Sequence, residues 1–165
     1  MYQARYYHAS VVLEKSLWVT GGYGGSRLKS TEFVHGDGTV TMGPDLPTAR
    51  SGHCMVTLHD GKVMIIGGYP TLHDVLVFDQ SNNVFTTGPS TLEKRYYHAC
   101  TLFNSPLHGN RPIVLAAGGS GSGTAEIYDY TITNEWQTSM YFLMFLKQEF
   151  LFLQCTAIAP FNKKF

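Results

Sequence analysis

The chain has 165 residues, the length of one domain or of one domain with a tail. It is 44% hydrophobic and only 15% charged, and 17 glycines, 10 tyrosines and 10 phenylalanines are typical of a β-rich globular protein rather than a disordered chain or a coiled coil. Twelve basic and twelve acidic residues leave no net charge, and the sequence shows neither the basic excess nor the basic stripe that is typical of a nucleic-acid binder, so we expect no nucleic-acid partner.

Along the chain, the first feature is the phrase Arg-x-x-His, which recurs at equal intervals. It reads RYYHA from residue 5, RSGHC from residue 50 and RYYHA from residue 95, so that His8, His53 and His98 are 45 residues apart. A fixed period of this length indicates repeats. We therefore divide residues 1–138 into units 5–49, 50–94 and 95–138, followed by a non-repeat tail at 139–165.

Each unit contains four short runs rich in Val, Ile, Thr and aromatic residues. The first runs are HASVVL, HCMVTL and HACTLF, and turns at 14–16, 59–61 and 104–111 separate them from LWVTGG, VMIIGG and IVLAAGG. The third runs are STEFVH, DVLVFD and AEIYDY, and the fourth are TVTMGP, VFTTGP and EWQTSM. Runs of this composition, bounded by Gly, Asp, Asn and Pro, predict strands joined by tight turns.

Four such strands in about 45 residues predict one antiparallel sheet per unit, and sheets repeated around an axis form a β-propeller. The predicted fold is all-β: an incomplete β-propeller of three four-stranded antiparallel blades, with an apolar C-terminal tail. Propellers close with about four to eight blades. Two explanations stay open, a truncated gene product and an arc that self-associates through its open blade faces.

The ordered set of Arg-x-x-His, a run ending in Gly-Gly, a later aromatic residue and a final Trp or Phe resembles the kelch repeat over residues 5–138. The resemblance implies that the Arg-x-x-His phrase begins the innermost strand of each blade. Glycine pairs allow close backbone approach, and we expect the later aromatic residues to cover them. The expected structural positions are Gly21, Gly22, Gly67, Gly68, Gly118, Gly119, Phe33, Phe78, Tyr128, Phe85 and Trp136.

The resemblance also implies a protein–protein interaction module, such as the substrate-recognition part of a ubiquitin-ligase adaptor. The alternatives are an actin-binding or scaffolding protein and, from another class, a fragment of a galactose-oxidase-like enzyme. Antiparallel strands bring each opening arginine and the loop after each glycine pair to one rim, where a partner would bind. The candidate partner-binding residues are Arg5, Tyr23, Arg27, Arg50, Tyr69, His73, Arg95 and Ser120.

No pattern in the sequence predicts catalysis, a cofactor or a metal. Equivalent histidines on neighbouring sheets lie about 10 Å apart, whereas zinc holds each nitrogen at about 2 Å. The run GGSGSGT at 118–124 lacks the Lys-Ser/Thr ending of a phosphate loop. We expect a non-enzymatic protein.

The three cysteines, Cys54, Cys100 and Cys155, cannot all pair. Because Cys54 directly follows its histidine and Cys100 lies two places after its own, their side chains should point to opposite faces of their strands. We expect free thiols in a reducing compartment. With no recognisable signal peptide in the first ten residues, this predicts a cytoplasmic location.

The tail contains the apolar windows YFLMFL and FLFL, interrupted by Lys147, Gln148, Glu149 and Gln154. A membrane span needs roughly 20 mostly apolar residues, so the interruptions disfavour a membrane partner. Two other interpretations are a helix or strand on the last blade and a segment with no evolved fold.

Overall fold

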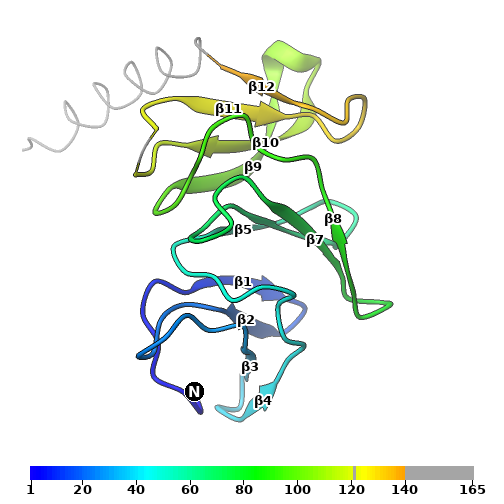
Figure 1. Cartoon of the computed structure of the whole chain (residues 1–165). Coiled ribbons are helices and arrows are strands. Elements are labelled where there is room, and N and C mark those ends of the chain that lie inside the picture. The colour runs from blue at the N-terminus through cyan, green and yellow to red at the C-terminus, as the bar shows by residue number, and fades with distance from the viewer. Residues whose placement is uncertain (121, 140–165) are drawn as a thin grey trace, which may run out of the picture.

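The computed structural model describes residues 1–120 and 122–139, so the interpretations of the tail beyond residue 139 lie outside the described residues. Three separate four-stranded antiparallel sheets make up the fold (Figure 1), which confirms the predicted all-β class and its three blades. No helix of the described part is long and apolar enough to cross a membrane.

The strands follow one another along the chain, and each sheet keeps that order. Blade 1 consists of β1 (Ala9–Leu13), β2 (Ser16–Thr20), β3 (Thr31–His35) and β4 (Val40–Met42). Blade 2 consists of β5 (Cys54–Thr57), β6 (Val63–Ile66), β7 (Val75–Asp79) and β8 (Val84–Thr87). Blade 3 consists of β9 (Ala99–Ser105), β10 (Arg111–Ala117), β11 (Ala125–Tyr128) and β12 (Trp136–Thr138).

The predicted 104–111 turn of blade 3 is shorter than expected. Strand β9 continues to Ser105 and β10 begins at Arg111, so residues 106–110 separate them, and the first three, Pro106–His108, form one turn of 3₁₀ helix. Gly109 ends that helix in the left-handed conformation, with φ of 68°. Glycine is the residue that most readily adopts this left-handed conformation at a helix end, because it has no Cβ atom.

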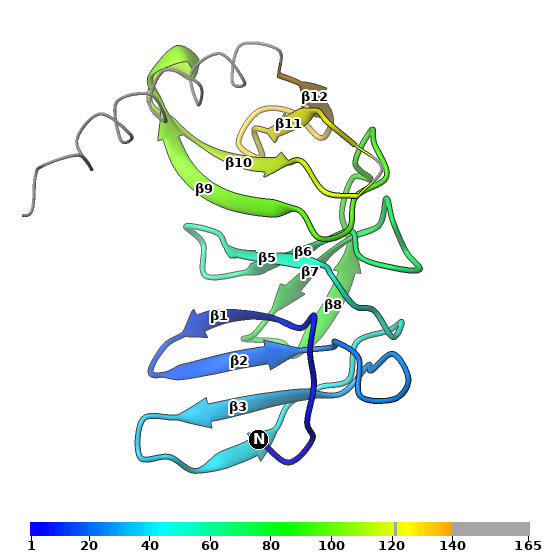
Figure 2. The same cartoon turned by 90° about the vertical axis from the view of Figure 1, so that its left-hand side faces the viewer.

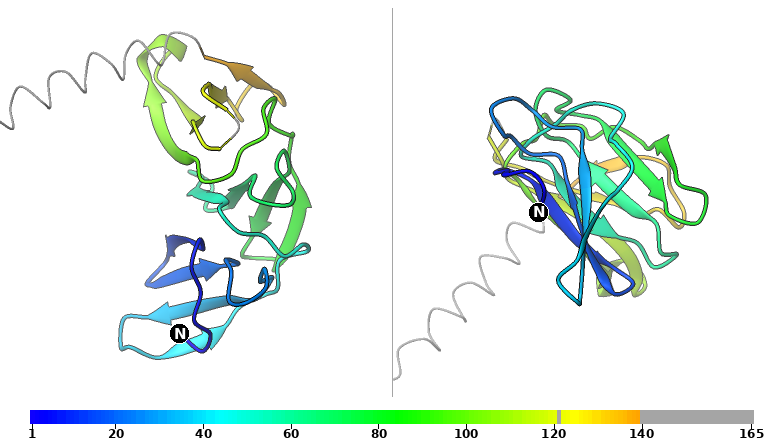
Figure 3. Two further views of the ribbon diagram at one scale, coloured as in Figure 1. Left: turned by 60° about the vertical axis from the view of Figure 1, so that its left-hand side comes forward. Right: turned by 90° about the horizontal axis from the view of Figure 1, so that it is seen from below.

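The blades stack face to face, with the first strand of each blade beside the first strand of the next. Contacts join β1 to β5 and β5 to β9, and Figure 2 shows the three sheets as successive layers. The layers follow a curved stack (Figure 3), as the blades of a propeller do around their axis. This arrangement agrees with the expectation that Arg-x-x-His precedes the innermost strand.

Two apolar clusters hold the blades together. Because strand side chains alternate between faces, blade 2 contributes to both: Ile65 and Phe78 face blade 1, whereas Met64 and Ile66 face blade 3. Trp18 of blade 1 is fully buried, with its ring centroid 4.6 Å from that of Phe78. Blade stacking therefore supplies the core that a single thin sheet lacks.

The strand register corrects one assignment of equivalent residues. Phe33 is the third residue of β3 and pairs with Trp18, whereas Phe78 and Tyr128 are one position later and pair with Phe85 and Trp136. Val34 is the residue of blade 1 that matches Phe78. Phe33 consequently packs toward blade 2, with its ring stacked 5.8 Å from Trp18.

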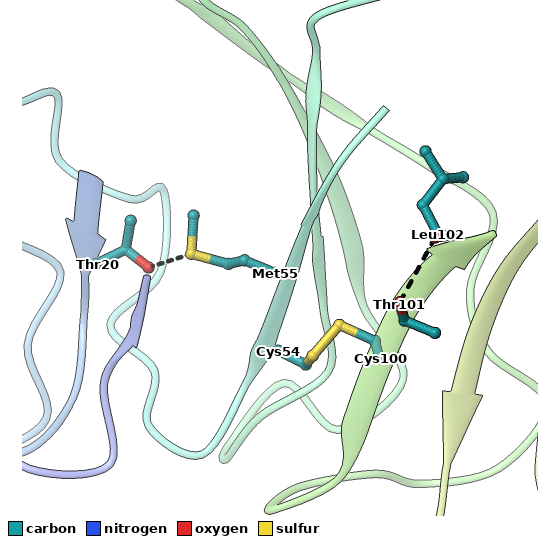
Figure 4. Close-up of a disulfide and its surroundings, with 6 residues drawn as sticks. All are labelled: Thr20, Cys54, Met55, Cys100, Thr101 and Leu102. Atoms are coloured by element: carbon teal, nitrogen blue, oxygen red, sulfur yellow. Dashed lines mark hydrogen bonds between the residues drawn. A yellow bond between two sulfur atoms is a disulfide. The ribbon is translucent and has the colours of Figure 1, made fainter. Parts of the chain in front are cut away.

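The expectation of free thiols is wrong for two of the three cysteines. A disulfide joins Cys54 of β5 to Cys100 of β9, with 6.0 Å between their Cα atoms (Figure 4). The two side chains do point to opposite faces of their own strands. Because blades 2 and 3 are stacked, Cys54 points toward blade 3 and Cys100 points toward blade 2, so the two sulfurs meet between the blades. Cys155 lies outside the described residues.

Candidate interaction surface

The three repeated arginines are buried within the blades and do not form part of the rim surface. Arg5 and Arg95 each form an ion pair with a glutamate of the third strand, Glu32 and Glu126, and the paired side chains have no exposed surface. Each also donates to a glycine carbonyl, Arg5 to Gly21 at 2.8 Å and Arg95 to Gly118 at 2.9 Å. Their burial places them out of reach of a partner.

The two glutamates also bind the chain segment that leads into each blade. Glu32 accepts hydrogen bonds from the backbone N–H groups of Tyr2 and Gln3, three and two residues before Arg5. Glu126 accepts the same pair of bonds from Leu92 and Glu93, three and two residues before Arg95. The arginine, the glutamate and two amides thus form one buried hydrogen-bonded group that fixes the approach to the inner strand.

Blade 2 has the arginine without the glutamate. Arg50 is 1% exposed and donates to the Gly67 carbonyl at 3.0 Å, but the position of the glutamate is taken by Leu76. The residue three places before Arg50 is Pro47, which has no N–H to donate. Blade 2 therefore lacks the carboxylate, and one of the two backbone amides that would donate to it is missing as well. Burial lowers the pKa of the unpaired Arg50.

The repeated histidines, not the later aromatic residues, cover the glycine pairs. A Cβ atom added at Gly21 would lie 2.9 Å from the ring of His53, and one at Gly67 would lie 3.2 Å from the ring of His98. Each histidine therefore packs on the first glycine of the preceding blade, which corrects the expectation for Phe33, Phe78 and Tyr128. Only a residue without a side chain leaves room for this contact.

Burial keeps these two histidines neutral. Desolvation, with a further contribution from Arg50, lowers the pKa of His53 to about 3, and desolvation lowers that of His98 to about 4. The Thr20 hydroxyl donates to the Met55 sulfur (Figure 4), so it accepts from the Nε2 of His53 at 2.7 Å. No group of three His, Cys, Asp or Glu side chains within the described residues could hold a metal ion.

Six tyrosines form a continuous cluster at the rim, across all three blades. Neighbouring ring centroids in this tyrosine cluster are 4.7 to 6.2 Å apart. Four of these residues are between 43% and 53% exposed, and the other two are half-buried. In the order of their contacts the residues are Tyr23, Tyr6, Tyr7, Tyr97, Tyr96 and Tyr69.

Two members of the tyrosine cluster have an unusual backbone. Tyr7 and Tyr97 both have φ of 57°, a left-handed conformation that is uncommon for bulky residues and costs on the order of 1–3 kcal/mol. The equivalent residue of blade 2 is Gly52, where an added Cβ would lie 2.7 Å from the Tyr97 ring. The glycine leaves space above blade 2 for the rings of Tyr7 and Tyr97 to meet.

The remaining candidate residues lie around this cluster. The exposed Arg27 guanidinium is 4.0 Å from the centroid of the Tyr69 ring. The Ser120 hydroxyl donates to the Tyr96 hydroxyl at 2.9 Å, and its N–H donates to the Tyr96 carbonyl. His73 is half-buried and bonds the Thr91 carbonyl through Nδ1. The predicted Tyr23, Arg27, Tyr69 and Ser120 are thus brought together, while His73 is occupied by a loop contact.

Four tyrosines of the cluster, at 6, 7, 96 and 97, were not among the predicted partner-binding residues. They stand between the arginine and histidine of the first and third phrases, so the doubled RYYHA contained the signal. Alternation alone could not reveal their exposure, because it depends on the left-handed turn at Tyr7 and Tyr97.

Three stacked four-stranded blades, each opened by Arg-x-x-His and each with a glycine pair, define the chain as a set of propeller-type repeats. No family profile matches the chain. It is similar to the kelch repeat-containing protein kel-10 of Caenorhabditis elegans, with 29% identity over 105 residues covering 59% of this chain and 18% of that protein. It is also similar to an F-box/kelch-repeat protein of Arabidopsis thaliana, with 33% identity over 84 residues covering 43% of this chain and 18% of that protein.

The resemblance to kelch-repeat proteins inferred from the sequence is confirmed by these two relatives together with the blades. The chain spans 18% of the length of each relative.

Proposed function

We propose that the chain is a protein-interaction module and that the tyrosine cluster is the surface that contacts the partner. The observation that carries this proposal is the exposure of Tyr6, Tyr7, Tyr69 and Tyr97 in one connected group. Tyrosine rings provide large rigid contact areas with a polar end, and tyrosine is enriched at binding hot spots. The strained backbone of Tyr7 and Tyr97 supports a functional role, because strain of this kind is concentrated at functional sites.

As a finer proposal, the module presents substrates to a ubiquitin ligase from a cytoplasmic location. The name of one relative combines an F-box with kelch repeats, which favours this role over actin binding. The docking domains of such an adaptor would lie in another part of the full-length product or on another chain.

The test is quantitative affinity capture with the wild-type chain and two single variants. Tyr69→Ala removes a ring of the cluster, whereas Tyr2→Ala removes a 72% exposed tyrosine that lies outside it. We expect Tyr69→Ala to lose the partner at least tenfold while Tyr2→Ala retains it, with thermal melting unchanged by either. Co-capture of a ligase scaffold would support the adaptor role and co-capture of actin the alternative.

Retention of every specific partner by a folded Tyr69→Ala variant, and by a Tyr6→Ala variant, would contradict the assignment of this surface. Loss of folding in Tyr69→Ala would make that residue a packing residue, and Tyr6→Ala, at 53% exposure, would then decide the question.

A further inference from the structure

The Cys54–Cys100 disulfide lies close in the chain to the tyrosine cluster. Cys54 is two residues after Gly52, and Cys100 is three residues after Tyr97. The Tyr97 N–H donates to the Gly52 carbonyl at 2.7 Å, and the Tyr97 ring lies over Gly52, where an added Cβ would be only 2.7 Å from it. The hydrogen bond and the disulfide are therefore neighbouring links between the same two segments, one leading into β5 and the other into β9.

Tyr97 connects the blade 1 rings of the cluster to the remaining rings. It contacts Tyr7 of blade 1 and Tyr96 of its own blade, with ring centroids 4.7 and 5.0 Å away. Its backbone is left-handed, with φ of 57°. A bulky residue keeps such a conformation only where the surrounding structure enforces it. The contacts that hold β9 against β5 therefore also determine the shape of the cluster.

The two junctions between blades differ in one of the bonds that hold them. At the junction of blades 1 and 2, the Thr20 hydroxyl bonds the Nε2 of His53 at 2.7 Å. At the junction of blades 2 and 3 the equivalent residues are Ile66 and His98, and neither nitrogen of His98 has a hydrogen-bond partner among the described residues. The second junction has the disulfide instead of this side-chain hydrogen bond.

Both cysteines of the disulfide retain solvent-accessible surface, since Cys54 and Cys100 are half-buried. A small thiol can therefore attack the bond as a thiolate, forming a mixed disulfide with one cysteine while the sulfur of the other leaves. A second thiol molecule then displaces the first. The two cysteines gain two electrons and two protons and become thiols, and the reductant leaves as its own disulfide.

We propose that this disulfide is a redox switch for the tyrosine cluster. In the oxidised chain, β9 is held against β5 and Tyr97 stays between Tyr7 and Tyr96. When a thiol such as glutathione reduces the bond, the Gly52–Tyr97 hydrogen bond opens more often. The partner then binds less tightly, because a surface that must be ordered on binding loses affinity. The effect on binding rests on the proposed function, whereas the effect on the hydrogen bond does not.

Amide hydrogen exchange of the full chain tests the switch without a partner. All samples carry Cys155→Ser, so that Cys54 and Cys100 are the only cysteines. On addition of reduced glutathione we expect the Tyr97 N–H to exchange at least tenfold faster. The Gly52 N–H, whose 2.8 Å hydrogen bond runs to blade 1, should keep its rate.

The matched control is Cys54→Ser/Cys100→Ser, which should exchange at the fast rate with and without glutathione. Equal rates at the Tyr97 N–H in the oxidised and reduced chains would overturn the proposal. Equal acceleration at Tyr97 and Gly52 would also overturn it, because the whole arc would then open rather than one junction. The comparison of oxidised and reduced chains decides the question even if the control variant does not fold.

The effect on binding is measured with the partner obtained by affinity capture. We expect reduction to weaken binding at least fivefold. Unchanged affinity in a chain whose Tyr97 N–H has become fast would overturn the redox control of binding and leave the tyrosine cluster as the partner surface. Retention of the partner by the Tyr69→Ala and Tyr6→Ala variants would overturn the proposed function, and with it the redox control of binding. The exchange rates would still support or overturn the effect of the disulfide on the cluster.

Discussion

At the residue scale, the buried ion pairs show how one arginine per blade serves structure rather than recognition. Glu126 accepts hydrogen bonds from Arg95 and from two backbone amides, and its side chain has no exposed surface. Removing one member of such a group leaves the others buried without a partner, and this typically costs about 3–5 kcal/mol. The position of the segment that leads into blade 3 therefore depends on the Glu126 carboxylate.

We expect Glu126→Gln to lower the free energy of unfolding by about 3 kcal/mol, since a neutral amide cannot satisfy the guanidinium and two amides together. Urea denaturation of the variant and of the control Glu93→Gln, at an exposed position, measures the difference. Equal stability of the two variants would show that the ion pair contributes little.

The neutral histidines predict a loss of stability in mild acid. In the folded chain the pKa values of His53 and His98 are about 3 and about 4, below the value near 6.5 of an unfolded histidine. The unfolded state therefore binds the proton first. Stability is fully present above pH 6.5 and falls as the pH drops toward 4, by about 1.4 kcal/mol per pH unit for each histidine.

Urea denaturation between pH 7 and pH 4.5 measures this slope. The variant His98→Leu removes an imidazole whose two nitrogens have no hydrogen-bond partner among the described residues, and it should show a smaller slope than the wild type. An identical slope in the two proteins would mean that His98 does not titrate on unfolding.

At the scale of the elements, the glycine pairs determine how closely one blade approaches the next. Gly67 and Gly61 both have positive φ, at 59° and 82°. An added Cβ at Gly67 would lie 2.4 Å from the Arg95 carbonyl oxygen, whereas one at Gly61 would meet nothing within 4 Å. The two positions thus separate the steric effect from the effect of backbone conformation.

We expect Gly61→Ala to cost about 1 kcal/mol, the strain of a left-handed alanine. Gly67→Ala should cost several kcal/mol more, because blades 2 and 3 must also move apart. Thermal melting of both variants provides the comparison. Similar losses of stability in the two variants would show that blades 2 and 3 can move apart without a loss of free energy.

Much of this architecture could be predicted because it repeats. The 45-residue stride, the four runs per unit and the glycine pairs gave the strands, their order and the number of blades. The register of Phe33 could not be read from composition, because aromatic residues one position apart point to opposite faces. The partner of each glycine pair was also missed, since His53 and His98 reach it from a different blade, a contact that no local pattern records.

The candidate surface was predicted only in part. Antiparallel pairing correctly brought Tyr23, Tyr69 and Ser120 to the rim near the opening phrases. The burial of Arg5, Arg50 and Arg95 follows from carboxylate and carbonyl partners far along the chain, which the phrase itself does not reveal. The rim surface is therefore tyrosine-rich rather than arginine-rich.

At the scale of the whole molecule, the disulfide joins two blades that are otherwise held by packing and hydrogen bonds. It links Cys54 and Cys100, which are 46 residues apart in the chain. We expect Cys54→Ser/Cys100→Ser to lower the free energy of unfolding by about 2–4 kcal/mol, as measured by denaturation under non-reducing conditions. If the wild type in reducing buffer is as stable as in oxidising buffer, the bond makes no contribution.

The bond also bears on the predicted cytoplasmic location. Disulfides persist mainly in oxidising compartments, whereas the cytoplasmic location was expected from free thiols. The bond therefore removes that support, and the cytoplasmic location stays a prediction. Mass spectrometry of the chain alkylated in intact cells would show whether the Cys54 and Cys100 thiols are free there.

The same covalent link makes the arc mechanically uneven. The first pair of inner strands has Ala9 and Met55 where the second pair has the two cysteines, so within the described residues no disulfide reinforces the packing of blade 1 on blade 2. If the molecule is stretched between its ends in an optical trap, we expect blade 1 to unfold at the lowest force. The segment between Cys54 and Cys100 would not extend under the applied force until a reductant breaks the disulfide.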